Sequence, residues 1–233
     1  MCTATWWRDG EDYTLFFNRD ELKTRSRAVP PELKVTEEGV GFITPTDPDA
    51  GGTWMLTNEH RVTVCVLNLW HHLGNKLPAT LSRGKVVLSL ADCTSCDDVH
   101  GRVKNMKLAG ARPFTLLSLD KDGELVLEWD GEVLLEKKIQ QPLTSSSFDF
   151  ENVASARRDE FSKVEKDASS LSAYHQCGDE NTAYTVRMCR PDAQTWSISK
   201  VEVSMAETLW EYQEELPELA SRPPLHRVSL QRC

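Results

Sequence analysis

The sequence MCTATWWRDGEDYTLFFNRDE, residues 1–21, decides the fold of this chain. Two runs that favour strands, at 3–7 and 13–17, flank an Asp-Gly pair that is typical of a tight turn. The segment therefore predicts a β-hairpin whose second strand ends in the polar run 18–21. Because the two strands are antiparallel, the hairpin brings this polar run opposite the beginning of the chain.

The rest of the chain continues this pattern of short strands. We expect a strand within the loop-like segment 24–49, at 41–44, hairpins at 54–57/62–68, 113–119/124–129 and 183–189/195–203, and a last strand at 209–212. The return strand 62–68 is almost wholly apolar, which predicts a central position with both faces buried. Two helices are expected, at 82–103 with Ser82 as N-cap and at about 153–173.

Strands paired in hairpins, with two helices well separated along the chain, predict an α+β fold. The simplest arrangement is two stacked antiparallel sheets with the helices outside. We find no linker, and we therefore expect one domain over residues 1–215. The proline-rich segment 216–233 is expected to form an irregular C-terminal tail.

The composition excludes several classes of protein. The chain has 233 residues, of which 39% are hydrophobic and 27% are charged, and a net charge of −9. Binding to nucleic acid or to an anionic membrane surface needs basic residues, so neither partner is expected. The longest apolar run, at 62–70, is far shorter than the roughly 20 residues of a membrane helix. The first residues show no signal-peptide pattern, and the seven cysteines have no regular spacing, which favours a cytoplasmic protein.

Cys2 is the residue best suited to chemistry. A small side chain after the initiator Met permits removal of that Met, and Cys2 would then carry both a thiol and a free α-amine. Such an amine has a pKa of about 8, low enough to accept the thiol proton near neutral pH. Arg19 would favour the thiolate, and Asp20 could orient the amine. Position alone leaves open the alternative of a chance cysteine that packs in a strand beside a solvated charge cluster.

The remaining polar candidates carry weaker signals. Asn68 ends the apolar return strand, where its amide could donate to an oxyanion or equally cap the following loop. Cys93 and Cys96 form a single CxxC, and because a zinc site needs a second pair of ligands we interpret both as incidental thiols. His71-His72 and His175 lack the spacing of metal ligands and are expected in a loop and at a helix end. No metal and no cofactor is therefore predicted.

Seven motifs, taken in order, resemble the NRDE-motif family, which includes transport and Golgi organisation protein 2. Each motif is weak by itself, but the ordered set is specific and extends roughly from Met1 to Tyr212. The motifs are Met1-Cys2-Thr3, Asn18-Arg19-Asp20-Glu21, Gly51-Gly52-Thr53-Trp54, Asn68, Ser82-Arg83-Gly84, and two segments similar to bacterial members, 143–149 and 188–193. This family in turn is similar to the N-terminal nucleophile hydrolases of the choloylglycine hydrolase and penicillin acylase type.

The resemblance implies a four-layer αββα sandwich and an amidohydrolase that cleaves a linear, non-peptide amide. Cys2 would be the nucleophile and its own amine the base. The other implied catalytic residues match the hydrolases in part: Arg19 and Asp20 at the end of the second strand, Asn68 in the oxyanion hole, and a helical arginine at Arg157 or Arg158.

Ser145 departs from the hydrolase pattern. Those hydrolases carry a Thr-Asn-Ser run, and in Thr144-Ser145-Ser146 a hydroxyl replaces the amide expected to contact the oxyanion or the nucleophile. The departure favours an alternative in which the chain is a non-enzymatic ligand-binding or trafficking protein that retains the hydrolase fold. A protein whose terminal cysteine senses oxidants is a third option. The first two readings predict a small-molecule amide as substrate or ligand, and the sequence leaves its identity and the oligomeric state open.

Overall fold

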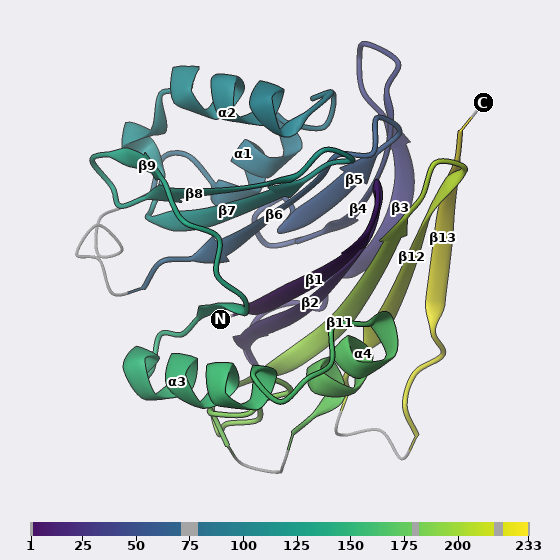
Figure 1. Cartoon of the computed structure of the whole chain (residues 1–233). Helices are drawn as coiled ribbons and strands as arrows, with labels where there is room; N and C mark the ends of the chain where they lie inside the picture. The colour runs from purple at the N-terminus through teal and green to yellow at the C-terminus, as the bar shows by residue number, and fades with distance from the viewer. Residues whose placement is uncertain (1, 71–78, 179–181, 217–220, 233) are drawn as a thin grey trace.

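The computed structural model of the chain describes residues 2–70, 79–178, 182–216 and 221–232. Its strands form two antiparallel sheets that stack face to face, and helices cover the outer surface of each sheet (Figure 1). The chain is therefore an α+β sandwich with four layers in the order αββα, as predicted.

The six-stranded sheet is built around the N-terminal hairpin. Its strands lie in the order β10 (Leu143–Ser145), β1 (Cys2–Asp9), β2 (Asp12–Leu22), β11 (Ala193–Val203), β12 (Glu207–Glu214) and β13 (His226–Gln231). Gly10 in the β1–β2 turn has φ +61°, a conformation that glycine adopts without a steric cost. The predicted hairpin is confirmed.

The seven-stranded sheet follows the chain order without a crossover. Its strands are β3 (Val29–Val35), β4 (Gly41–Thr46), β5 (Met55–Asn58), β6 (Thr63–Asn68), β7 (Phe114–Leu119), β8 (Glu124–Trp129) and β9 (Leu134–Glu136). The apolar strand β6 lies in the middle of the sheet and is buried on both faces, as its sequence predicts. The edge strands β3 and β9 were not predicted, because half-exposed short strands carry little hydrophobic pattern.

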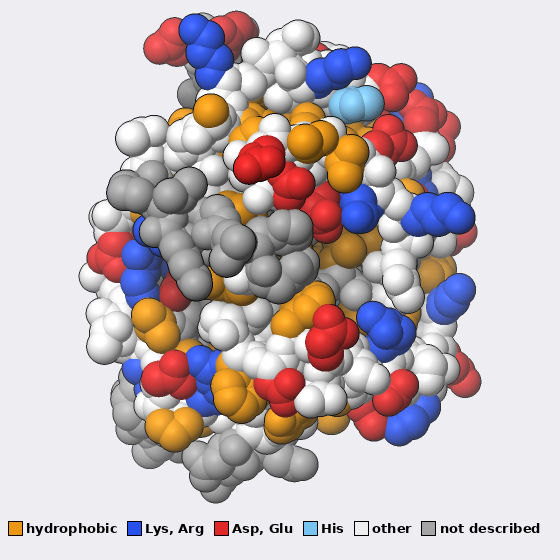
Figure 2. Space-filling model, turned by 90° about the vertical axis from the view of Figure 1, so that its left-hand side faces the viewer, with side chains coloured by type: hydrophobic (Ala, Val, Ile, Leu, Met, Phe, Trp, Pro, Cys, Tyr) orange, Lys and Arg blue, Asp and Glu red, His pale blue; other side chains and the backbone are white. Residues whose placement is uncertain are grey.

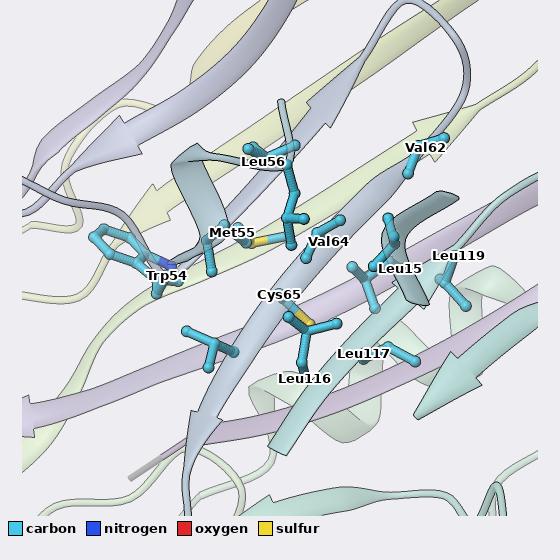
Figure 3. Packing of buried hydrophobic residues seen from close by; sticks show 14 of the residues in the cluster. Leu15, Trp54, Met55, Leu56, Val62, Val64, Cys65, Leu116, Leu117 and Leu119 are labelled. Carbon is cyan, nitrogen blue, oxygen red and sulfur yellow. The ribbon is translucent and has the colours of Figure 1, made fainter. Parts of the chain in front are cut away.

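The main hydrophobic core lies between the two sheets and under the helices of the seven-stranded sheet. Leu15 of β2 comes from one sheet, and Cys65 of β6 and Leu117 of β7 come from the other (Figure 3). All three side chains are 0% exposed, so the sheets are held together by close apolar packing.

The first predicted helix is two helices, α1 (Arg83–Leu88) and α2 (Cys96–Asn105), which lie on the seven-stranded sheet (Figure 1). Ser82 takes the N-cap position of α1, but its side chain makes no capping hydrogen bond. The break occurs because Ser95 caps α2 by accepting a hydrogen bond from the Asp98 N–H. The Asn58 amide also binds the Ala91 and Cys93 carbonyls at 2.9 and 2.7 Å, which stabilises the turn.

The second predicted helix is also divided, into α3 (Phe150–Phe161) and α4 (Ala168–Gln176), on the outer face of the six-stranded sheet. The Asp167 side chain accepts hydrogen bonds from the N–H groups of Ser169 and Ser170, at 2.8 and 2.9 Å. This cap begins a new helix where the sequence pattern suggested a continuous one.

Two further predictions are wrong. Residues 183–189 form no strand and contribute only an isolated bridge from Cys189 to Gln194, because β11 is already paired with β2 on one side and β12 on the other. The C-terminal segment is not irregular throughout, since β13 pairs with β12 along its length.

The surface has a mixed character. Figure 2 shows acidic and basic side chains interspersed over one face, with hydrophobic side chains between them. Within the part of the chain that the structure describes, no helix combines the length and the apolar character needed to cross a membrane.

Candidate active site

The β1–β2 hairpin places the polar run beside Cys2. Cys2 pairs directly with Arg19 of β2, and on its other side it pairs with Ser145 of β10. β1 therefore lies between two strands that each bring a predicted site residue to the start of the chain. The structure thus confirms that the polar run 18–21 lies beside Cys2.

A cavity of about 190 Å³ opens beside Cys2. Its walls come from both sheets and from the start of α1, and they include four of the six predicted site residues: Cys2, Arg19, Asp20 and Asn68. The other two, Ser145 and Arg157, contact these residues from behind the cavity wall. The six predicted residues thus form one cluster.

Cys2 is 8% exposed and lines this cavity. Burial raises the pKa of the Cys2 thiol above its ordinary value, and the negative charge of Asp20 raises it further. The Arg19 charge and a hydrogen bond from the Asp20 backbone oppose this shift. The resting thiol is protonated at neutral pH, and a reaction at its sulfur requires a nearby proton acceptor.

Asp20 is held from two directions. Its Oδ2 atom lies 3.5 Å from the Arg157 guanidinium, and both side chains are 0% exposed. Thr195 donates a hydrogen bond of 2.7 Å from its hydroxyl to Asp20 Oδ1. Burial raises the pKa of Asp20, while the Arg157 charge favours the carboxylate. Two fixed partners leave the carboxylate little freedom to move.

Arg157 is the helical arginine that faces the site. It is buried, whereas Arg158, the next residue of α3, is exposed. The Arg157 guanidinium also donates to Thr3 Oγ1 at 2.5 Å and to the Ala183 carbonyl at 3.3 Å. These contacts tie α3 to β1 and select between the two arginines that the sequence left open.

Arg19 extends along the other wall of the cavity. Its guanidinium lies 4.4 Å from the centre of the Trp54 ring, a cation–π contact. It forms ion pairs with Glu21 at 3.7 Å and with Asp47 at 3.6 Å. The positive charge of Arg19 is therefore balanced by carboxylates of the chain itself.

Asn68 lies at the end of β6 and lines the cavity. The alternative role as a loop cap is not seen at Leu69, whose N–H donates to the Pro113 carbonyl at 3.2 Å. The rest of the expected loop, with His71-His72, lies outside the described residues. Ser145 is buried, and its hydroxyl has no hydrogen-bond partner among the described residues.

Thr195 is a site residue that the sequence analysis did not find. It lies on β11, where the pairing with β2 shifts register between Thr195 and Ser197. Thr195 pairs directly with Asp20, and its hydroxyl reaches the Asp20 carboxylate. A single threonine in a strand carries no local signal for such a role.

The remaining candidates lie away from the cavity. Burial raises the pKa of Cys93 and of Cys96 to about 12, which is unsuited to redox chemistry near neutral pH. Both thiols are free. Cys96 begins α2, whereas the predicted helix 82–103 would have placed it late in a helix.

His175 lies at the end of α4 as predicted. Across residues 2–70, 79–178, 182–216 and 221–232, no group of three or more His, Cys, Asp or Glu side chains is placed to hold a metal ion.

Solved structures share this fold. A mutant of the conjugated bile acid hydrolase from Clostridium perfringens superposes with a TM-score of 0.57 at 13% identity, covering 98% of this chain and 92% of that one. The N-acylethanolamine-hydrolyzing acid amidase ortholog of Caenorhabditis elegans gives a TM-score of 0.61 at 10% identity, covering 86% and 92%. At these identities the likeness shows the fold of an N-terminal nucleophile hydrolase.

The sequence comparisons define the family. No curated protein sequence matches the chain significantly. The model of the family described as Transport and Golgi organisation 2 matches residues 1–222, nearly the whole chain. The chain therefore belongs to the Transport and Golgi organisation 2 family.

Proposed function

We propose that this protein hydrolyses a linear, non-peptide amide with the Cys2 thiol as nucleophile. The observation that carries the proposal is the placement of Cys2 in a cavity with Arg19, Asp20 and Asn68, backed by the buried Arg157–Asp20 pair. The amide-hydrolysing neighbours of the same fold support the reaction class. The cavity of about 190 Å³ favours a small-molecule substrate.

The first half of the reaction forms a thioester. Removal of Met1 gives Cys2 a free α-amine, which accepts the thiol proton as the sulfur attacks the carbonyl carbon. The negative oxygen that develops on the substrate accepts a hydrogen bond from the Asn68 amide. As the C–N bond breaks, the protonated α-amine gives its proton to the leaving amine.

The second half of the reaction regenerates the thiol. The α-amine accepts a proton from water as the water oxygen attacks the thioester carbonyl, and the C–S bond then breaks. The sulfur recovers the proton from the α-amine, and the carboxylic acid is released. Arg19 favours the thiolate that forms transiently, and Asp20 orients the α-amine.

Arg157 acts on this chemistry through Asp20. Its guanidinium fixes the carboxylate and the Thr3 hydroxyl, and it does not line the cavity itself. Ser145, opposite Cys2 on β10, supplies a hydroxyl where the related hydrolases carry an amide.

A ligand-binding protein without catalytic activity is the second candidate. The replacement at Ser145 favours it, because a serine hydroxyl extends less far than an asparagine amide. The pocket and the fold would then be retained for binding alone. This candidate predicts that Cys2→Ala leaves ligand binding and cellular function intact.

The decisive experiment compares wild type with Cys2→Ala on a library of small acyl amides. Intact mass spectrometry first establishes whether the purified chain begins at Cys2. We expect hydrolysis by wild type, none by Cys2→Ala, and unchanged activity in Cys177→Ala, which removes an exposed thiol. Retention of Met1, or equal amide turnover by wild type and Cys2→Ala, would refute the nucleophile.

A second measurement probes the thiol directly. With a processed terminus, Cys2 should react with iodoacetamide faster than the other cysteines, because the adjacent amine accepts its proton. Peptide mapping after short exposures gives the rate at each cysteine. Equal rates at Cys2 and at the buried Cys65 would contradict an activated nucleophile.

A further inference from the structure

Arg83 differs from the other arginines of the cavity. Three arginines line its wall: Arg19, Arg25 and Arg83. Arg19 pairs with Glu21 and Asp47, and Arg25 pairs with Asp47 and Asp49. Among the residues that the structure describes, no carboxylate lies within ion-pair distance of Arg83.

The carboxylates of the cavity wall are already occupied. Asp20 pairs with Arg157, and Glu21 and Asp47 pair with Arg19. Each of these acidic side chains thus has a guanidinium partner other than Arg83. The wall carries as many acidic as basic side chains, and Arg83 is its one arginine without a carboxylate partner among the described residues.

The surroundings of Arg83 make this charge costly. Its Nη1 donates to the Pro113 carbonyl at 3.1 Å, and its guanidinium lies 6.0 Å from the Trp70 ring centre. Burial, together with the positive charge of Arg112, lowers the pKa of Arg83 to about 10, which leaves it cationic at neutral pH. An anionic group in the cavity would offset the desolvation of this guanidinium.

The backbone at Arg83 is held close to the cavity. Arg83 begins α1, and the next residue, Gly84, packs directly on Gly52 and Thr53 of the opposite wall. The Thr53 N–H donates to the Gly84 carbonyl at 3.4 Å. These contacts fix the position of the Arg83 backbone relative to Cys2. A substrate group bound by Arg83 would therefore lie at a set distance from the Cys2 thiol.

We propose that Arg83 is a specificity-determining residue that binds a carboxylate on the substrate, so that the amides hydrolysed here are short and acidic. A guanidinium presents paired N–H donors that match a carboxylate, and Nη1 alone is used by the backbone. The cavity of about 190 Å³ is smaller than the roughly 300 Å³ at which drug-sized pockets begin, which favours a compact acid. This inference rests on the proposed amidase function.

The test compares acids with their neutral esters. Two pairs place the carboxylate on either side of the scissile bond: succinamic acid and its methyl ester for the acyl half, and N-acetylglycine and its methyl ester for the amine half. We expect kcat/KM to favour the acid in one of these pairs by about 10- to 100-fold, the range of a charge-assisted hydrogen bond. In Arg83→Gln this acid-to-ester ratio should fall to near one.

Arg102→Gln is the matched control. It also removes one arginine charge, but Arg102 lies on α2 and pairs with Asp92, away from the cavity. It should retain the acid-to-ester ratio of the wild type. If wild type prefers the esters, or if Arg83→Gln and Arg102→Gln keep the same ratio, the inference is overturned.

A binding measurement separates this inference from the amidase proposal. Calorimetry with Cys2→Ala measures binding of succinate and of N-acetylglycine without turnover, and Cys2→Ala/Arg83→Gln should bind the acid at least about tenfold more weakly. Such a loss in a protein that hydrolyses no amide would support the anion site and refute the amidase. Hydrolysis of neutral amides, with no difference in acid binding between the two variants, would support the amidase and refute the anion site.

Discussion

Gly52 and Gly84 pack backbone against backbone at the point where the turn before β5 meets the start of α1. A Cβ atom on Gly52 would lie 2.9 Å from the Gly84 carbonyl carbon, and one on Gly84 would lie 2.7 Å from the Thr53 nitrogen and oxygen. Two motifs that are far apart in the sequence, Gly51-Gly52-Thr53-Trp54 and Ser82-Arg83-Gly84, are therefore the two sides of a single contact. This contact forms part of the cavity wall.

Gly84→Ala should destabilise the fold. The new methyl group would press on backbone atoms of Thr53, which cannot rotate away, so the free energy of unfolding should fall by about 1–3 kcal/mol. Urea denaturation measures the change. Gly101→Ala is the control, because Gly101 lies in α2 with open space at its Cβ position and should gain roughly 0.5–1 kcal/mol. Equal effects at both positions would contradict the close contact.

Arg157→Met should be strongly destabilising. It leaves the Asp20 carboxylate buried without its ion-pair partner, and the free energy of unfolding should fall by about 3–5 kcal/mol. The double variant Asp20→Asn/Arg157→Met should recover part of this loss, because it removes the buried charge as well. Chemical denaturation gives the three values. Arg158→Met, at the exposed neighbouring position, should change stability by less than about 0.5 kcal/mol.

The free energy of unfolding should fall in acid because of His175. This residue is fully buried; its Nδ1 donates a hydrogen bond of 2.8 Å to Asn18 Oδ1, and its Nε2 accepts one of 2.8 Å from the Thr5 hydroxyl. Burial, and then the charge of Arg157, lowers the pKa of His175 to about 3, whereas the unfolded chain has a value of about 6.5. Between these values the unfolded state binds a proton that the folded state does not. Stability is therefore complete above about pH 6.5 and is lost toward pH 3, by up to about 1.4 kcal/mol per pH unit.

Denaturation of wild type and His175→Gln across pH 3–7 isolates this contribution. The difference in free energy of unfolding between the two should shrink as the pH falls. His60→Gln, at an exposed position, should leave the wild-type pH dependence unchanged. An NMR titration of the His175 ring gives an independent check that does not depend on a variant, and a His175 pKa near 6.5 in the folded protein would contradict the prediction.

Thr195→Val should slow the proposed reaction without removing any group that contacts the substrate. The Thr195 hydroxyl donates to Asp20 Oδ1 and accepts a hydrogen bond of 2.9 Å from the Met188 N–H. Its loss frees the carboxylate to move, and kcat should fall by roughly 10- to 100-fold with a smaller change in KM. Thr195→Ser keeps the hydroxyl and should restore most of the activity. A parallel loss in both variants would indicate a role of the side chain other than the hydrogen bond to Asp20.

Local patterns in the sequence were sufficient for the elements that carry their own signal. The Asp9-Gly10 turn and its flanking strands predicted the hairpin, and pairing of Cys2 with Arg19 followed from it. The apolar run of β6 predicted its central position, since only a strand covered on both faces buries every side chain. The helix breaks at Ser95 and Asp167 were not predicted. Each of these side chains begins a new helix through hydrogen bonds that form only in the folded chain, whereas the apolar periodicity of the sequence favours one continuous helix.

The site residues also divide into those that the sequence predicted and those that only the folded structure revealed. By itself, the sequence determined that Cys2, Arg19 and Asp20 would meet, because one tight hairpin connects them, and family motifs pointed to Asn68, Ser145 and an arginine near position 157. Only the tertiary structure decided that Arg157 faces Asp20, that Thr195 holds the same carboxylate, and that Arg83 lacks a carboxylate partner among the described residues. These relationships join distant segments, and they are fixed by how the sheets and helices pack, which no local pattern of residues encodes.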